Sequence, residues 1–580
     1  LYSQDVHFVL ELVQNADDTH YADGVVPTLR VELDQTQLVF ESNEIGFTER
    51  NVRALCDIGS STKKREQVGY IGYKGIGFKS VFKVSCRPEI HSRRWHFAFD
   101  STDPDLGYIV PRMRAAPPDW DNSQGTRIVL PFHNNNMENM DPVTLESLRK
   151  RIGELQPRIL LFLHRLRRIE VHDRGNGMVA RYSLIGKRRT FTRRDVSSRV
   201  EETIVFAIKK IEETVDGGTR NEEWWTTTQT LDVPERLQRS KMNSTEMCAA
   251  FPNESDPSTL TDCHVFAFLP VRSYGFRFIL QADWLLPSSR ETVDSSSPWN
   301  QWLLSKFPDL FIAAAVDLLR KARQLQHKGS DVRELPAALP IKREELQEDG
   351  QQHLVELKDD LDVAEPEADS EPAVDSYHLD QGAARLIDLL FAIIPIPAQI
   401  VDFFRPAAAQ LLRQVSDSLE CIPVRDFQSH RVRFVKPSQA VTVMDFANEA
   451  GVEETCVRQL SRMGLFVVHD SVVLTTEVAK ALGIQVLATS PDLLIDMLSR
   501  LCVEWEGDAG RVDLPWLAWC LQTLGRCQNV SLPKLRHLAF VPLQDGSVVA
   551  VDENTPAFEN SNSLFDAAQK ADFLKGLRLV

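Results

Sequence analysis

Two short stretches near the N-terminal end constrain this 580-residue chain more than any other part of it. Residues 6–18 predict an amphipathic helix, because four apolar residues recur at the spacing of one helical face: Val6, Val9, Leu10 and Val13. A second stripe of this helix is polar and consists of Glu11, Asn15 and Asp18. Such a stripe is usually a solvated face, but Asn is a poor helix-interior residue unless its side chain has a partner. Residues 69–80 then form a glycine run that would let backbone approach phosphate groups.

The spacing of this glycine run excludes two common phosphate-binding loops. A dinucleotide fingerprint needs G-x-G-x-x-G, and here the order is reversed at Gly72, Gly75 and Gly77. A P-loop needs Lys followed by Ser or Thr directly after its last glycine, but Phe78 separates Gly77 from Lys79. The run therefore belongs to neither class.

The nine cysteines are scattered, odd in number and without a Cys-x-x-Cys pair. We therefore expect neither a disulfide framework nor a zinc site. We expect the protein to be intracellular, in the cytoplasm or the nucleus. No apolar run is long enough to span a membrane, so we expect no membrane association. The chain begins at Leu1, inside the approach to the first helix, so we expect a missing N-terminal segment.

The net charge of −16 belongs to one segment. Fourteen acidic residues and one basic residue lie between Glu344 and Asp380, a net of −13 that leaves about −3 for the remainder. The acidity of this segment argues neither for nor against nucleic acid, whereas the near-neutral charge of the remainder disfavours nucleic acid as a partner. Residues 187–194 are basic with one aromatic residue, which predicts a solvated hairpin tip more than a nucleic-acid site.

Pattern and length predict four regions: 1–185, 186–330, an acidic disordered linker over 331–380, and a helix-rich region over 381–580 with two embedded hairpins. We expect a hairpin over 28–40, a helix over 48–58 capped by Thr48, and strands over 81–84, 95–99, 126–132, 265–269 and 276–280. A helix is expected from Asp141, with His164 on a helix as a packing or surface residue, and a buried helix over 299–321.

Four ordered motifs resemble the GHKL (Bergerat-fold) ATPase superfamily: Glu11…Asn15…Asp18, residues 42–47, residues 69–80 and Gly125-Thr126. More closely, residues 11–18, 58–63, 72–82 and 88–92 resemble the N-terminal ATPase-like domain of the sacsin and NO VEIN type. The resemblance implies an α+β fold, namely a GHKL α/β sandwich in which helices cover a mixed sheet. A transducer-like α/β domain and the helix-rich region would follow it.

The resemblance also implies a site for ATP and Mg²⁺. Asn15 would hold Mg²⁺, which takes few protein ligands, and Glu11 would orient and deprotonate the attacking water. Three glycines would bring backbone N–H groups to the phosphates. The residues that the resemblance marks for nucleotide binding are Asn15, Asp18, Ser42, Asn43, Gly46, Ser61, Thr62, Lys63, Gly72, Lys74, Gly75, Ile76, Gly77, Phe78 and Thr126.

The chain departs from the superfamily at the residue that reads adenine. The Asp that accepts a hydrogen bond from the exocyclic amine aligns with Ser42, and the glycine two residues later aligns with Glu44. A hydrogen bond to a charged acceptor contributes about 1.5–3 kcal/mol, roughly ten- to a hundredfold in affinity. Asn43 would be a weaker acceptor. The sacsin and NO VEIN type resembles this chain in lacking the Asp, so its loss need not abolish binding.

Residues 282–291 resemble the middle-domain loop of the ninety-kilodalton heat-shock chaperones, which ends in Ser-Arg-Glu. By this resemblance Arg290 would reach the γ-phosphate and act with Glu11 in catalysis. The other interpretation is a surface ion pair of Arg290.

The resemblance implies an ATP-binding, slowly hydrolysing, chaperone-like machine with client or partner proteins, and it leaves a homodimer open. The alternative is a nucleotide-binding scaffold or protein-interaction module without ATPase activity, which the missing Asp favours. A DNA-associated ATPase of the MutL type is disfavoured by the near-neutral charge outside residues 344–380.

Overall fold

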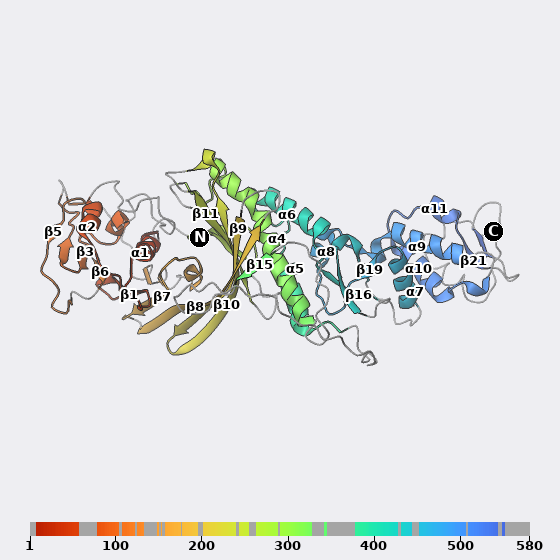
Figure 1. Ribbon diagram of the computed structural model, residues 1–580, viewed down its shortest axis with the longest axis horizontal. Coiled ribbons are helices and arrows are strands. Elements are labelled where there is room, and N and C mark those ends of the chain that lie inside the picture. Colours follow the sequence, from red (N-terminus) through yellow and green to blue (C-terminus); the bar gives the residue numbers. More distant parts are fainter. Residues whose placement is uncertain are drawn as a thin grey trace. The chain divides into compact units, whose positions relative to one another are not determined.

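The computed structural model describes residues 7–56, 78–103, 107–121, 125–132, 148–149, 152, 157–175, 177–194, 201–238, 243–253, 263–287, 291–326, 341–344, 378–426, 431–443, 452–505, 509–542 and 548–550. Its contacts divide the chain into two compact units (Figure 1). The first comprises Leu1–Ala314, Glu334–Val355 and Gln399–Ala407, and the second comprises Ala315–Arg333, Glu356–Ala398 and Ala408–Val580.

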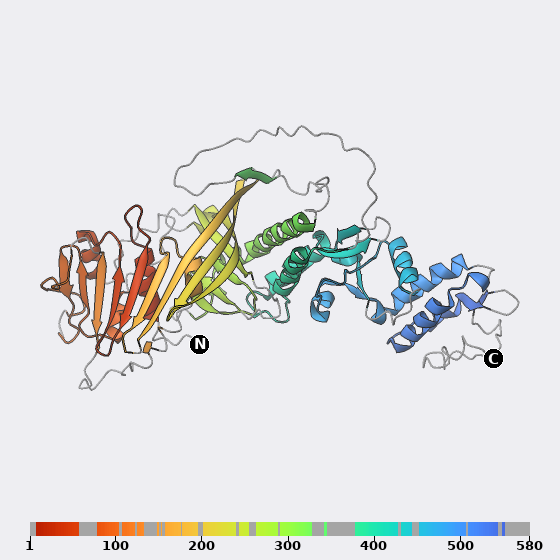
Figure 2. The same ribbon diagram turned by 90° about the horizontal axis from the view of Figure 1, so that it is seen from below.

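A single mixed sheet of 15 strands dominates the first unit (Figure 2). Its order is β13-β12-β14-β11-β10-β9-β8-β7-β1-β2-β6-β3-β4-β5, and β15 pairs with β8. The strands of its first half are β1 (Thr28–Leu33), β2 (Gln37–Ser42), β3 (Glu89–Ser92), β4 (Trp95–Ala98), β5 (Arg112–Met113), β6 (Thr126–Pro131) and β7 (Arg168–Asp173). The expected hairpin over 28–40 is confirmed, since β1 and β2 pair antiparallel, and so are the expected strands at β4 and β6.

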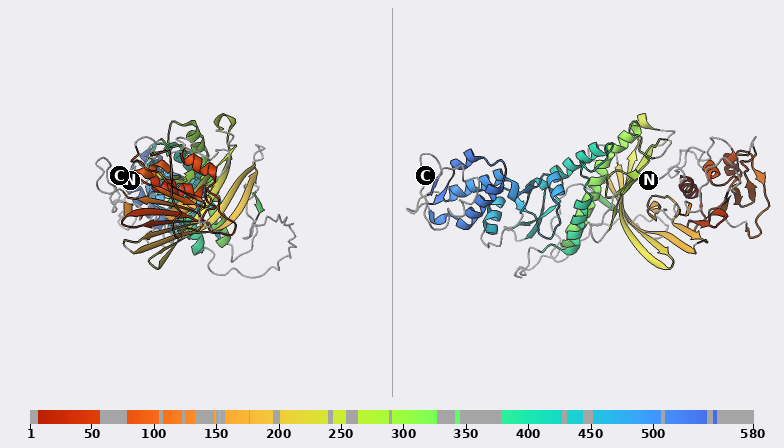
Figure 3. Two further views of the ribbon diagram at one scale, coloured as in Figure 1. Left: turned by 90° about the vertical axis from the view of Figure 1, so that its left-hand side faces the viewer. Right: turned by 180° about the vertical axis from the view of Figure 1, so that it is seen from behind.

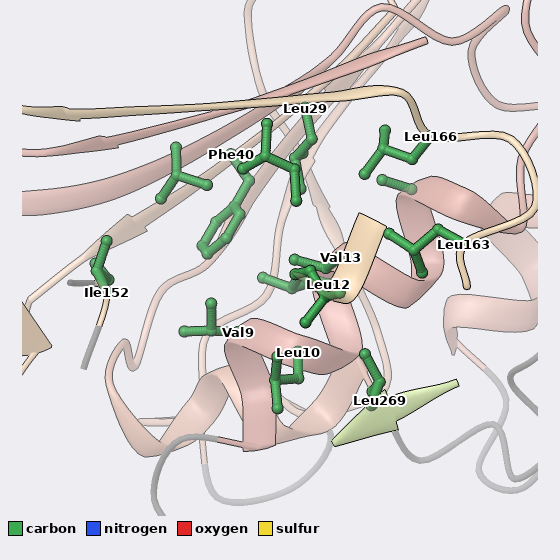
Figure 4. Close-up of a cluster of buried hydrophobic side chains, with 14 of the residues drawn as sticks. Val9, Leu10, Leu12, Val13, Leu29, Phe40, Ile152, Leu163, Leu166 and Leu269 are labelled. Carbon is green, nitrogen blue, oxygen red and sulfur yellow. The ribbon is translucent and has the colours of Figure 1, made fainter. Parts of the chain in front are cut away.

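Helix α1 (His7–Asp17) covers one face of this half of the sheet. Its side chains Val9, Leu12 and Val13 are buried among residues of the sheet that include Leu29 and Phe40 (Figure 4). Helix α2 (Glu49–Cys56) begins directly after Thr48, whose Oγ1 accepts from the N–H of Asn51 at 3.4 Å, as the expected cap requires. The helix expected from Asp141 lies largely outside the described residues.

Two local predictions in this half are wrong. Residues 78–83 form a 3₁₀ helix, η1 (Phe78–Lys83), where a strand was expected over 81–84. Its buried residues are Phe78, Val81 and Phe82, at the i, i+3 and i+4 spacing of a helical face, and this spacing is seen only when Phe78 is included. His164 follows a second 3₁₀ helix, η2 (Pro157–Leu161), and lies in a bend instead of a helix.

The second half of the sheet consists of long strands β8 (Met178–Arg194), β9 (Glu201–Val215), β10 (Gly218–Asp232) and β11 (Ser244–Pro252), whose bend is visible in Figure 3. A hairpin at this place is confirmed, but residues 187–194 pair with β9 along the strand and are not its tip. Strand β15 (Ile341–Glu344) pairs antiparallel with β8. A described strand therefore lies within the segment that was expected to be a disordered linker.

The sheet ends in β12 (His264–Ala267), β13 (Leu269–Ser273) and β14 (Ile279–Ala282). The sequence predicts two strands here, 265–269 and 276–280, but Phe268 interrupts the first, and the second begins at Ile279. β12 pairs antiparallel with β13 and parallel with β14. The long helix α4 (Pro298–Gln326) follows and contains the buried helix expected over 299–321. The short η3 (Glu235–Leu237) lies after β10.

The second unit is rich in helices: α5 (Gln381–Ile393), α6 (Arg405–Ser418), α7 (Val452–Arg462), α8 (Thr476–Leu482), α9 (Pro491–Glu504), α10 (Leu514–Arg526) and α11 (Leu532–Arg536). Two hairpins lie among them, β16 (Ile422–Asp426) with β17 (Arg431–Val435), and β21 (Ala539–Pro542) with β22 (Val548–Ala550). The sequence patterns did not reveal a parallel sheet of β18 (Ala440–Thr442), β19 (Phe466–Val467) and β20 (Gln485–Val486). Residues of α7, α9 and α10 form the core here, around Leu494 and Trp516.

The protein is thus of mixed α/β type, with a large mixed sheet and helices. None of the described helices is both long enough and apolar enough to cross a membrane.

Candidate functional site

The polar stripe of α1 is not an ordinary solvated helix face. Phe8, Leu12 and Gln14 are buried in addition to the apolar stripe, so the helix is enclosed on most sides. Glu11 and Asn15 are half-buried and have interacting neighbours, and Asp18 is 3% exposed just after the helix. Two polar side chains one turn apart therefore lie within the fold.

Asp17 fixes the end of this helix, although the sequence motif pointed to its neighbour Asp18. The Asp17 side chain is fully buried, and its carboxylate accepts three backbone N–H groups, from His164 at 2.9 Å and from Arg165 and Leu166 at 2.7 Å. A carboxylate with three N–H donors is a strong local clamp. The partners lie 147–149 residues away in the sequence, so no local pattern could have revealed them.

The adjacent strands β2, β6 and β3 bring three hydroxyl side chains into one row at the ends of these strands. Ser42 pairs with Thr126, and Thr126 pairs with Ser92. The hydroxyls of Ser92 and Thr126 are hydrogen-bonded at 2.7 Å, and Ser92 Oγ accepts from the N–H of Phe47 at 2.7 Å. Ser42 and Thr126, two residues expected at the adenine end, are therefore adjacent.

Glu44 is a residue of this row that sequence reasoning missed. Its side chain is 7% exposed, and its Oε1 accepts a hydrogen bond of 2.5 Å from Thr126 Oγ1. Backbone packing here is tight, because a Cβ at Gly125 would lie 2.0 Å from the carbonyl oxygen of Ser42. The alignment placed Glu44 where the superfamily has glycine. The buried carboxylate next to Thr126 therefore comes from this position and not from position 42.

Asn43 and Gly46 shape the loop around Glu44. Asn43 is exposed, and its side chain accepts from the N–H of Thr28 at 2.8 Å and donates to the carbonyl of Val26 at 2.9 Å, so it is engaged at the start of β1. Gly46 has a φ of 84°, and a Cβ there would lie 2.6 Å from the Arg93 side chain. A left-handed conformation in such close packing requires glycine.

Tyr21 connects the end of α1 with Ser42. Its hydroxyl donates to the carbonyl of Ala16 at 2.8 Å and lies 3.1 Å from Ser42 Oγ. Burial raises the pKa of Tyr21 to about 12, so the phenol stays protonated as a donor. The hydroxyl of Ser42 therefore already has a partner within the chain.

Of the residues expected near the phosphate groups, the structure describes only Phe78. Phe78 starts η1, is 7% exposed and packs against Phe99. The Lys79 ammonium donates to the carbonyl of Tyr108 and lies 4.2 Å from the Phe99 ring centroid, and burial lowers its pKa. The remaining expected residues lie outside the described part of the chain: Ser61, Thr62, Lys63, Gly72, Lys74, Gly75, Ile76, Gly77 and Arg290.

Comparison with known proteins gives one informative relative. No protein-family model matches the chain. The chain is 38% identical over 362 residues to Protein NO VEIN of Arabidopsis thaliana. The matched part is 59% of this chain and 12% of the plant protein, so the chain spans only a small part of that relative. This similarity supports the NO VEIN type that the sequence motifs indicate.

Proposed function

We infer that the first unit binds Mg·ATP and that the chain hydrolyses it slowly, as part of a chaperone-like conformational machine. The observation that carries this proposal is the buried carboxylate of Glu44, hydrogen-bonded to Thr126 at 2.5 Å beside Ser42. The resemblance expects an acid and a threonine together at the adenine end of such a site. Here the acid is supplied two residues later than expected.

Glu44 offers what Ser42 lacks. A carboxylate accepts a hydrogen bond from the exocyclic amine of adenine more strongly than a hydroxyl or an amide does. The Thr126 hydroxyl uses its proton on Glu44 and accepts from Ser92 Oγ at 2.7 Å, which leaves one lone pair as a further acceptor. Asn43, the acceptor that the sequence suggested, is engaged with Thr28 and Val26. We therefore propose Glu44 as the adenine-reading acid.

The roles proposed for the remaining residues follow the resemblance. Asn15 would hold Mg²⁺ through its side-chain oxygen, and Glu11, one turn earlier on α1, would orient the attacking water. The backbone of residues 72–77 would bind the phosphates, and Arg290 would stabilise charge on the γ-phosphate. The half-burial of Glu11 and Asn15 supports a role inside the fold.

One observation favours a second candidate, a scaffold that keeps the fold without binding nucleotide. The Tyr21 hydroxyl lies 3.1 Å from Ser42 Oγ and is held by the Ala16 carbonyl. A tyrosine at this place competes for space at the adenine end. The scaffold would then act by binding partner proteins.

Titration calorimetry on the full chain separates the two candidates. We expect Mg·ATP and Mg·ADP to bind and Mg·GTP to bind more weakly, because GTP presents a carbonyl where adenine has its amine. If millimolar nucleotide gives no heat from a folded protein, the ATPase proposal is wrong and the scaffold stands. A Tyr21→Ala variant, which removes the ring together with the hydroxyl, is the control for occupancy of the site by Tyr21.

A further inference from the structure

A buried glutamine in β14 holds the turn between β12 and β13. Gln281 is 5% exposed, and its Oε1 accepts a hydrogen bond of 2.7 Å from the backbone N–H of Phe268. Phe268 joins the two strands with a φ of 64°, in the left-handed region that residues other than glycine rarely adopt. Such a conformation persists only where its surroundings hold it. The Gln281 side chain is the buried partner that does so.

The turn presents two neighbouring side chains to the first half of the unit. The Phe268 ring lies 5.5 Å from the ring of His164, measured between centroids. Leu269, 7% exposed, belongs to the buried cluster that contains Leu10 of α1 and Leu163 (Figure 4). The β12–β13 turn is therefore packed against the loop at residues 163–167 and against α1.

That loop in turn holds the end of α1. The backbone N–H groups of His164, Arg165 and Leu166 all donate to the Asp17 carboxylate. A second contact is the Arg165 guanidinium, which donates to the Asp17 carbonyl at 3.3 Å. A chain of contacts thus runs from Gln281 through Phe268 and His164 to the helix that carries Glu11 and Asn15.

We propose that Gln281 is a positioning residue for α1. It fixes the β12–β13 turn, the turn fixes the 163–167 loop, and the loop sets where Glu11 and Asn15 stand. The effect of Gln281 on ATP turnover rests on the proposed function of α1. The effect of Gln281 on the position of α1 does not depend on that function. Gln281 touches no reacting atom, so its removal changes the order of α1 and the turnover rate more than nucleotide affinity.

Hydrogen–deuterium exchange on the ligand-free full chain tests the placement directly. Gln281→Met keeps the length of the side chain and removes its acceptor, and Gln281→Glu keeps an acceptor oxygen. The control is Gln229→Met, because Gln229 is 1% exposed in β10, two strands from β14 in the sheet. We expect amide exchange in 7–17 and 163–167 to rise about three- to tenfold in Gln281→Met, the size of one lost hydrogen bond. We expect Gln229→Met to stay near the wild-type rates. Gln281→Glu keeps the acceptor but buries a carboxyl group, so we expect a rise smaller than that of Gln281→Met at pH 5 to 6.

A second variant covers the case in which Gln281→Met does not fold. Phe268→Gly removes the ring contact with His164, while glycine adopts the left-handed turn without strain. The same rise in exchange is expected. Unchanged exchange over 7–17 in both variants overturns the proposal.

Turnover separates this proposal from the proposed function. If the wild type hydrolyses ATP, Gln281→Met should lower kcat about three- to tenfold, the factor expected for amide exchange. The Kd for Mg·ATP should change less than about twofold. An unchanged kcat overturns the catalytic consequence. If the wild type has no ATPase activity but exchange over 7–17 rises in the variant, the placement of α1 is supported and the proposed hydrolysis is what fails.

Discussion

Thr126 donates a hydrogen bond of 2.5 Å to the carboxylate of Glu44, 82 residues earlier in the chain. Both side chains are 7% exposed. Burying a carboxylate costs free energy unless hydrogen bonds compensate for its lost hydration, and the Thr126 hydroxyl is one such donor. The pair lies where the resemblance expects adenine to be read, and this coincidence is the centre of the functional proposal.

Asn15→Ala and Glu11→Ala should separate metal binding from catalysis. We expect Asn15→Ala to remove the Mg²⁺ dependence of ATP binding, because Asn15 is the proposed metal ligand on α1. Glu11→Ala should leave the Kd for Mg·ATP within about threefold and lower kcat by about a hundredfold or more, the usual contribution of a general base. Calorimetry with and without Mg²⁺, together with steady-state phosphate release, measures both. Equal losses of affinity in the two variants would contradict these roles.

Asp17→Ala should lower the stability of the first unit. The variant removes an acceptor of three buried backbone N–H groups, and each charged hydrogen bond contributes about 1.5–3 kcal/mol. We expect the urea concentration at the unfolding midpoint to fall clearly. Tryptophan fluorescence monitors the unfolding.

Asp34→Ala is the matched control for Asp17→Ala. The Asp34 carboxylate also accepts three hydrogen bonds, from Thr36 N, Thr36 Oγ1 and Gln37 N, but in a partly exposed turn. Water can satisfy the groups that Asp34 leaves, so its loss should shift the midpoint much less. Similar shifts in the two variants would show that the Asp17 clamp adds no special stability.

Acidification should destabilise the first unit through His96. His96 is 9% exposed, its Nδ1 lies 3.3 Å from that of His91, and burial and then the His91 charge lower its pKa. A folded-state pKa below the ordinary value of about 6.5 means that the unfolded chain takes up the proton first as pH falls. Stability is therefore full above the ordinary value and is lost as pH falls from there toward the folded-state pKa.

The measurement compares thermal midpoints at pH 7.5 and pH 5.5 for the wild type and for His96→Phe. We expect the wild type to lose more on acidification than the variant, in which this group is absent. Glu89, whose pKa is lowered chiefly by its hydrogen bond with His91, acts in a lower pH window, below the ordinary carboxylate value of about 4.3. If the thermal midpoints of the wild type and of His96→Phe fall equally between pH 7.5 and pH 5.5, His96 is not the cause of the acid destabilisation.

Local patterns were sufficient to predict β1, β2, β4, β6, α4 and the Thr48 cap, because each depends on residues within a few positions. They failed at Phe268, since a non-glycine residue with positive φ carries no turn signal, and the Gln281 hydrogen bond that holds it comes from another strand. They also failed at residues 81–84, because the helical spacing of the buried residues appears only when Phe78 is counted with Val81 and Phe82. For the site, α1 and the pairing of Ser42 with Thr126 agree with the motifs. Glu44 and Asp17 did not emerge, because their partners lie 82 and 147 residues away.

The most direct test of the account compares Mg·ATP with Mg·ITP, whose base has a carbonyl in place of the exocyclic amine, on the wild type and on Glu44→Gln. If Glu44 reads the amine, the wild type should prefer ATP by about tenfold or more, the value of one hydrogen bond to a charged acceptor. Glu44→Gln, whose amide can also donate to the carbonyl of ITP, should lose most of that preference while keeping its fold. A wild type that binds both nucleotides equally, or a variant that keeps the full preference for ATP, would contradict the assignment of Glu44.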